Sequence, residues 1–86
     1  MADERPLIDR IRSHVGELCG VDPSTISDDG KLVAYGLDSV RAVELTLILE
    51  EELGIELSEH DPELARVETL RELADLVRRR REGGAP

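Results

Sequence analysis

The sequence has 86 residues and almost no aromatic side chains, with Tyr35 as the only one and neither Phe nor Trp. A hydrophobic core must therefore be built from Leu, Ile and Val. The single cysteine, Cys19, excludes an internal disulfide and a zinc site made of cysteines, and we expect it to be a reduced, partly buried thiol. No apolar run approaches the roughly 20 residues of a membrane helix, and the N-terminus does not have the pattern of a signal peptide. These absences favour a small soluble domain, which we expect to be cytoplasmic and free of the membrane.

Positive charge is scarce, because 11 Lys and Arg face 20 Asp and Glu and leave a net charge of −9. Such a surface repels the phosphates of nucleic acids and suits docking onto basic patches of other proteins. The chain is also 40% hydrophobic, which is enough for a folded domain. We expect one monomeric domain over residues 1–82, followed by a disordered tail over residues 83–86.

The apolar residues follow helical spacing and show no strand-like alternation. The first helix is predicted from about Glu4 to Cys19, and Gly20 ends it. A long loop over residues 21–37 follows. We expect this loop to be ordered because five apolar side chains can pin it over the core: Val21, Ile26, Leu32, Val33 and Leu37.

Three further helices are predicted. The second runs from Ser39 to about Leu53, and a short third one starts with Asp61 as its N-cap. Thr69 and Glu72 form a capping box that opens the last helix, whose buried face is Leu70, Leu73, Ala74 and Val77. The predicted fold class is all-α, a small bundle of three main helices and one short helix with a long ordered first loop.

Two charged segments invite a binding interpretation. The run Asp28-Asp29-Gly30 fails as an EF-hand, because its twelfth position would be Gly36 where a Glu is required. The four arginines 78–81 fit a solvated helix end, where the helix dipole favours cations, better than a nucleic-acid patch.

The two histidines, His14 and His60, are far apart in the sequence, and neither has a Ser or Cys motif beside it. We therefore expect surface or boundary positions for both rather than a catalytic role.

The second helix carries two apolar sectors. One sector belongs to the core and consists of Ala42, Leu45, Leu49 and Leu53 with Thr46 beside them. The other consists of Val40, Val43 and Leu47. We expect Val43 to pack against the first loop and the third helix, and Val40 and Leu47 to be partly exposed beside Glu44 and Glu51. An apolar spot rimmed by carboxylates suits a basic partner.

Ser39 lies in the segment Gly36-Leu37-Asp38-Ser39-Val40, where a glycine-ended loop meets the second helix. A helix start has free N–H groups and a positive dipole end, so it can hold a phosphate. A serine at this place is by itself an ordinary N-cap. Asp38 can also cap, which would leave the Ser39 hydroxyl facing outward.

The run GLDSVRAVELTLILEEELGIEL, in its order and spacing, resembles the acyl and peptidyl carrier proteins, and the resemblance extends from Leu7 to Val77. It implies a carrier-protein four-helix bundle with 4'-phosphopantetheine joined to Ser39 as a phosphodiester. It also implies that Asp38 helps a phosphopantetheinyl transferase to place its metal-bound coenzyme A. Positions of the second helix that correspond to Val40, Glu44, Leu47 and Glu51 would meet partner enzymes.

The resemblance further implies that the chain is a tether without catalysis of its own. Its partners would be the transferase and an acyl ligase, ketosynthase, acyltransferase or similar enzyme. Arg41 stands where housekeeping fatty-acid carriers usually have an acidic residue. The segment Tyr35-Gly36-Leu37-Asp38-Ser39 and the run Ala42-Val43-Glu44-Leu45 look more like polyketide-synthase or peptide-synthetase carriers, whereas Glu50-Glu51-Glu52 looks like a stand-alone carrier. We expect fatty-acyl or polyketide cargo, which could retreat among Leu45, Leu49, Leu53 and Leu73. The alternatives are an aminoacyl or peptidyl carrier and an adaptor that is never modified.

Overall fold

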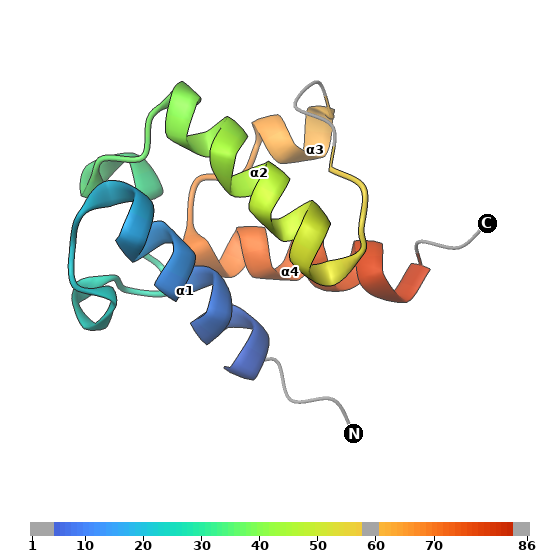
Figure 1. The fold of residues 1–86 in the computed structure, drawn as a ribbon, viewed down its shortest axis with the longest axis horizontal. Helices are drawn as coiled ribbons and strands as arrows, with labels where there is room; N and C mark the ends of the chain where they lie inside the picture. Colours follow the sequence, from blue (N-terminus) through green and yellow to red (C-terminus); the bar gives the residue numbers. More distant parts are fainter. Residues whose placement is uncertain (1–4, 58–60, 84–86) are drawn as a thin grey trace.

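The computed structural model describes residues 5–57 and 61–83. It contains α1 (Arg5–Cys19), α2 (Ser39–Leu53), α3 (Pro62–Ala65) and α4 (Leu70–Gly83), with two short 3-10 helices between α1 and α2 (Figure 1). These are η1 (Pro23–Thr25) and η2 (Leu32–Tyr35). No β-strand occurs in the described ranges, so the predicted all-α fold is confirmed. No helix within them is both long and apolar enough to cross a membrane.

The ends of the helices follow the predicted signals. Gly54 ends α2 in the left-handed conformation, with φ of 66°, as a C-cap should. Asp61 caps α3 by accepting the N–H of Glu63 at 2.9 Å. The capping box of α4 is also present, because Glu72 accepts the Thr69 N–H at 3.0 Å and donates its own N–H to the Thr69 hydroxyl at 3.1 Å.

Some predictions at the margins of these elements lie outside the described residues, namely Glu4, His60 and the tail residues 84–86. Gly83, which we assigned to the tail, is the last residue of α4.

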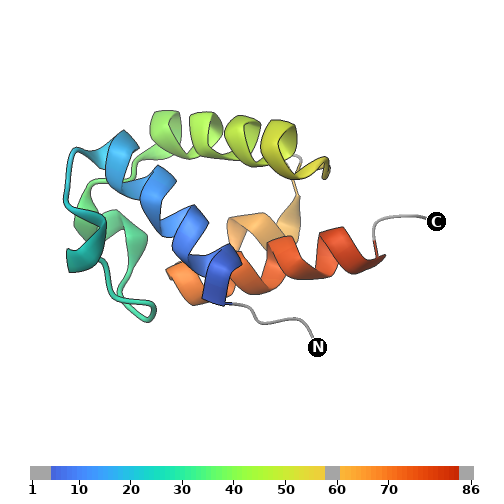
Figure 2. The same ribbon diagram turned by 60° about the horizontal axis from the view of Figure 1, so that its bottom comes forward.

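α1 packs against both α2 and α4, and α3 packs against α4. In the turned view of Figure 2, α2 lies along one side of the bundle while α3 and α4 lie along the other. The core between them is aliphatic, as the lack of Phe and Trp requires. Leu76, which was not predicted as a core residue, is 1% exposed. The side chains with the least exposure are Ile11, Val15, Leu49, Leu70, Leu76 and Val77.

The first loop is ordered, as predicted, and two side chains from within it, Ile26 and Leu32, are buried in the core. Val21 and Leu37 pack partly against the same core. The prediction for Val33 is wrong, because this side chain is 73% exposed. η2 turns Leu32 inward, and Val33, the next residue, consequently faces solvent.

Ion pairs hold the loop on both sides. Arg12 on α1 pairs with Asp28, and Arg71 on α4 binds Asp29 with an Nε–Oδ1 distance of 2.7 Å. The backbone N–H of Arg71 also donates to the Asp28 carbonyl oxygen at 2.9 Å. The two aspartates that suggested a calcium loop therefore act as anchors between the loop and two helices.

The four arginines at the end of α4 differ in their surroundings: Arg79 and Arg81 are exposed, as predicted for a solvated helix end, whereas the Arg80 side chain is only 28% exposed. Arg79 and Arg80 reach across to Glu63 and Asp61 of the α3 segment. Arg81 is exposed, and Arg78 pairs with Asp75 and Glu82 of its own helix. The sequence does not reveal that α3 folds back onto this part of α4.

Candidate functional site

The predicted site lies at the corner where the first loop turns into α2. Gly36 ends η2 with φ of 101°, a backbone conformation that a side chain would strain. Asp38 follows in an extended conformation as the N-cap, and Ser39 is the first residue of α2. The turn therefore places Ser39 at the positive end of a helix of 15 residues.

Asp38 caps α2 as predicted, and both of its carboxylate oxygens bind Arg41. Oδ1 accepts the Arg41 backbone N–H at 2.8 Å, and Oδ2 accepts from Arg41 Nη1 at 2.8 Å. The hydrogen bond from the backbone N–H, with help from the guanidinium charge, lowers the pKa of Asp38. The cap is consequently ionised near neutral pH and does not depend on the Ser39 hydroxyl.

Arg41 also connects this corner to the first helix. Its Nε donates to the Leu18 carbonyl oxygen at 2.9 Å, so the guanidinium caps the C-terminal turn of α1 while it holds Asp38. Cys19 lies beside the same corner as a half-buried free thiol, and burial raises the pKa of that thiol. The observed exposure of Cys19 matches the prediction.

The Ser39 side chain is exposed, and within the described residues its hydroxyl makes no hydrogen bond. The hydroxyl is therefore accessible to a modifying enzyme and costs no internal contact when it is substituted. A phosphodiester at this oxygen would lie at the start of α2, where N–H groups and the helix dipole favour an anion. The geometry fits a phosphate-linked group at Ser39.

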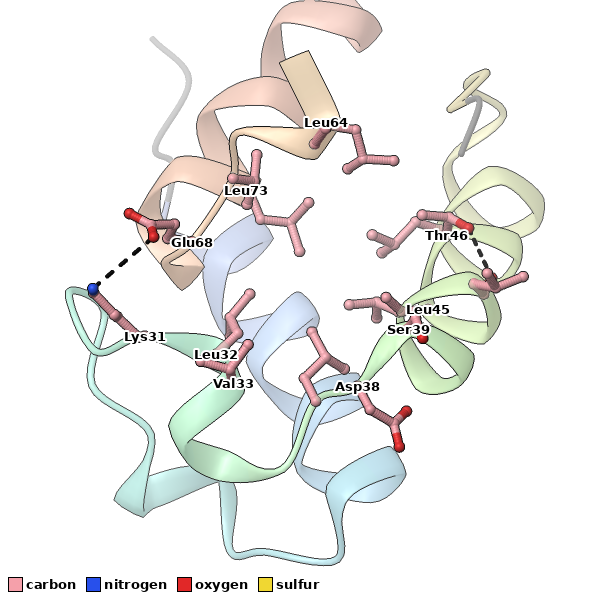
Figure 3. A pocket seen from close by; sticks show the side chains of 16 residues that line it. Lys31, Leu32, Val33, Asp38, Ser39, Leu45, Thr46, Leu64, Glu68 and Leu73 are labelled. Carbon is pink, nitrogen blue, oxygen red and sulfur yellow. Dashed lines mark hydrogen bonds and ion pairs between the residues drawn. The ribbon is translucent and has the colours of Figure 1, made fainter. Parts of the chain in front are cut away.

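Ser39 also lies at the edge of an apolar cavity of about 560 Å³. In Figure 3, Leu45 and Thr46 of α2 face Leu64 of α3 and Leu73 of α4 across this space, while the Asp38 carboxylate points away from it. The Thr46 hydroxyl donates to the Val43 carbonyl oxygen at 2.7 Å, so the polar group of this lining residue is already satisfied within α2. Of the predicted lining residues, Leu45, Leu49 and Leu73 line the cavity, and Leu53 does not.

The outer face of α2 is apolar between carboxylates, as predicted. Val40 is 68% exposed and Leu47 is 57% exposed, and Glu44 and Glu51 are exposed on the same helix. Val43 was expected to pack against the first loop and the third helix, but it is 38% exposed and lines the cavity, so this prediction is wrong. Val33 on η2, which was not predicted to belong to this surface, lines the same cavity.

The carboxylates of α2 divide into two groups. Glu50 accepts the Leu57 N–H at 3.0 Å, and Glu52 binds Arg10 at 3.2 Å and His14 at 2.9 Å. Glu44 and Glu51 make no ion pair or hydrogen bond through their side chains within the described residues. The latter two carboxylates are therefore free to meet a partner, and His14 occupies the boundary position that we expected.

Comparisons with known proteins agree with this geometry. Residues 9–77 match the family described as "Phosphopantetheine attachment site". The acyl carrier protein of Thermotoga maritima is 26% identical over 81 residues, which cover 93% of this chain and 98% of that protein. A non-reducing polyketide synthase of Emericella nidulans is 44% identical over 46 residues, which cover 54% of this chain but only 2% of the synthase.

A solved structure extends the similarity to peptidyl carriers. The free-standing peptidyl carrier protein of Acinetobacter baumannii is 33% identical to this chain and superposes with a TM-score of 0.75. The match covers 87% of this chain and 91% of that protein. The resemblance in sequence and the resemblance in fold therefore point to the same group of proteins.

Proposed function

Because this chain belongs to the phosphopantetheine attachment family, whose members bear a covalent 4'-phosphopantetheine group, we propose that it is an acyl carrier protein modified at Ser39. The bound group supplies a terminal thiol that holds the cargo as a thioester. The observation that carries the proposal is the accessible Ser39 hydroxyl, free of internal hydrogen bonds, at the start of α2 and at the edge of an apolar cavity.

Each residue of the corner has a role in this proposal. Ser39 is the attachment site. Asp38 caps the start of α2, and its carboxylate faces the transferase when the two proteins meet. Val40 and Leu47 supply apolar contact, and Glu44 and Glu51 attract basic partner surfaces. The partners are a phosphopantetheinyl transferase and pathway enzymes such as an acyl ligase, ketosynthase or acyltransferase. The chain performs no chemistry itself, and we expect it to act as a cytoplasmic monomer.

The cavity favours an acyl cargo of fatty-acid or polyketide type. Each methylene that leaves water for an apolar environment contributes about 0.8 kcal/mol. The cavity begins at Ser39 and is lined by aliphatic side chains of α2, α3 and α4. A chain of several carbons can therefore fold back from the arm and be stabilised there, whereas a charged aminoacyl group gains little.

The second candidate is an aminoacyl or peptidyl carrier. The similarity to the Acinetobacter baumannii peptidyl carrier supports it, as does the resemblance of the run Ala42-Val43-Glu44-Leu45 to polyketide-synthase and peptide-synthetase carriers. The cargo experiment below separates this candidate from the acyl one.

Intact-mass measurement tests the attachment site. Incubation with coenzyme A and a phosphopantetheinyl transferase should add one phosphopantetheinyl group to the wild-type chain and none to Ser39→Ala. Ser39→Ala should keep its helical circular dichroism, because Asp38 caps α2. An alanine variant that is still modified would place the site elsewhere, and an unmodified wild type would favour the adaptor alternative.

Loading tests the cargo. The octanoyl form should melt at a higher temperature than the unloaded holo form, and the methyl NMR signals of Leu45, Leu49 and Leu73 should shift. A glycyl load should do neither. If octanoyl leaves both the melting temperature and these signals unchanged, the aminoacyl or short-chain alternative replaces the acyl one.

A further inference from the structure

One wall of the apolar cavity is a helix with weak core packing. α3 has only four residues, Pro62–Ala65, and none of them is fully buried. Leu64 and Ala65 nevertheless line the cavity opposite α2, followed by Val67. The half-buried Leu64 is the main apolar contact of α3 with the core. Something else must help to hold this wall at its distance from α2.

Ion pairs with α4 provide that hold. Arg79 Nη1 lies 2.9 Å from Glu63 Oε2, and Arg80 Nη2 lies 3.2 Å from Glu63 Oε1. Arg80 Nη2 also binds Asp61 Oδ2, and these two side chains are only 28% and 14% exposed. Asp61 is the N-cap of α3, so Arg80 contacts the residue on which the start of that short helix depends. Two consecutive arginines thus join the N-cap and the second residue of α3 to α4.

We propose that Arg79 and Arg80 are positioning residues for the cargo, because they hold α3 at the distance from α2 that keeps the apolar cavity in shape. This inference rests on the proposed acyl cargo. It separates Arg79 and Arg80 from the other two of the four consecutive arginines, which the sequence alone does not do. Arg81, the next residue, carries the same charge but makes no ion pair within the described residues.

The consequence is a local response to salt. Ion pairs near the surface weaken as salt screens them, whereas the aliphatic packing of α1, α2 and α4 does not. Added salt should therefore loosen α3 and reduce the hold on a sequestered chain. The rest of the domain should respond in the opposite direction, because salt relieves the mutual repulsion of a chain with a net charge of −9.

Hydrogen exchange on the unloaded protein tests the ion pairs without any cargo. The Ala65 N–H donates to the Asp61 carbonyl oxygen at 3.0 Å and the Arg66 N–H to the Glu63 carbonyl oxygen at 3.1 Å. Both amides should exchange faster in Arg80→Gln than in the wild type, on the order of fivefold. Arg81→Gln is the matched control and should leave them unchanged.

A substitution on the other side of the contact gives an independent measurement. Glu63→Gln should speed the exchange of the Ala65 amide as Arg80→Gln does, and the double variant should show less than the product of the two effects. Exchange rates in Arg80→Gln equal to those in Arg81→Gln would overturn the proposed role of the ion pairs.

The cargo experiment then tests the positioning role. The increase in melting temperature on octanoyl loading should be smaller in Arg80→Gln than in Arg81→Gln, and in the wild type it should shrink at high NaCl. An equal increase in both variants at every salt concentration would overturn positioning by the arginines. If octanoyl gives the wild type no increase although Ser39 is modified, the acyl cargo itself fails and the positioning role falls with it.

Discussion

Arg12 on α1 binds Asp28 in the middle of the first loop, and the Arg12 side chain is only 17% exposed. The same guanidinium donates to the Ile26 carbonyl oxygen, so it satisfies a backbone acceptor of the loop as well as a carboxylate. The largely buried Arg12 side chain therefore fixes the loop that leads to Ser39 to the first helix.

Arg12→Ala should lower the free energy of unfolding by about 2 kcal/mol, because hydrogen bonds to charged groups are among the stronger ones and Asp28 would lose its closest partner. Urea denaturation measures the change. Lys31→Ala is the control, since the Lys31–Glu68 pair is 3.9 Å apart with both side chains 65% exposed, and it should cost less than about 1 kcal/mol. Equal losses in the two variants would contradict the structural role of Arg12.

Glu72 should make the fold sensitive to acid. The backbone N–H groups of Glu68 and Thr69 lower the pKa of Glu72, so the folded chain binds fewer protons at this site than the unfolded chain does. The stabilisation is complete above the ordinary Glu pKa of about 4.3 and is lost as the pH falls through the lowered value.

Glu72→Gln tests this linkage. The stability difference from the wild type should be largest at neutral pH and should shrink as the pH falls below about 4. Glu56→Gln is the control, because the exposed Glu56 side chain makes no contact of this kind within the described residues. A difference for Glu72→Gln that does not vary with pH would show that charge at this cap is unimportant.

Global stability should rise with ionic strength. With 20 acidic and 11 basic side chains, the folded chain repels itself at low salt, and screening relieves this repulsion. NaCl and MgCl₂ should both raise the melting temperature. Calcium should show no saturable transition, because Asp28 and Asp29 are engaged by Arg12 and Arg71. A micromolar calcium transition of fixed stoichiometry would reopen the question of a metal site.

The free carboxylates of α2 should steer the transferase. Glu44→Lys and Glu51→Lys should each reduce kcat/KM for modification of Ser39, on the order of tenfold at low salt and less at high salt. Glu82→Lys changes the net charge equally at the far end of α4 and should have little effect. If all three variants behave alike, net charge rather than the α2 surface governs recognition.

The sequence was sufficient for the helices and for the corner at Ser39 because both depend on local signals. Apolar spacing defined α1, α2 and α4, and cap residues such as Asp38 and Thr69 marked their starts within a residue. Leu76 was missed because it lies at the margin of the apolar stripe of α4, and whether such a position is buried depends on the neighbouring helices.

The cavity could not be predicted, because it depends on the distance between α2 and α3, which no local pattern determines. The errors at Val43 and Leu53 have this single cause: the space between the helices lies beside Val43 and does not reach Leu53. Long-range charge pairs were missed for the same reason. Arg12 and Arg80 find their partners 16 and 19 residues away in the chain, and many acidic residues were available to each.

Tyr35, the only aromatic residue, lies in η2 four positions before Ser39, and its hydroxyl accepts the Ser27 N–H at 3.0 Å. An atom added at Gly30 would collide with this hydroxyl, so the ring is enclosed by the turn that precedes it. The ultraviolet emission of the chain consequently originates from one ring on the segment that precedes Ser39. A change in the packing of the first loop should therefore change the tyrosine emission of the isolated protein, which can be measured without an added dye.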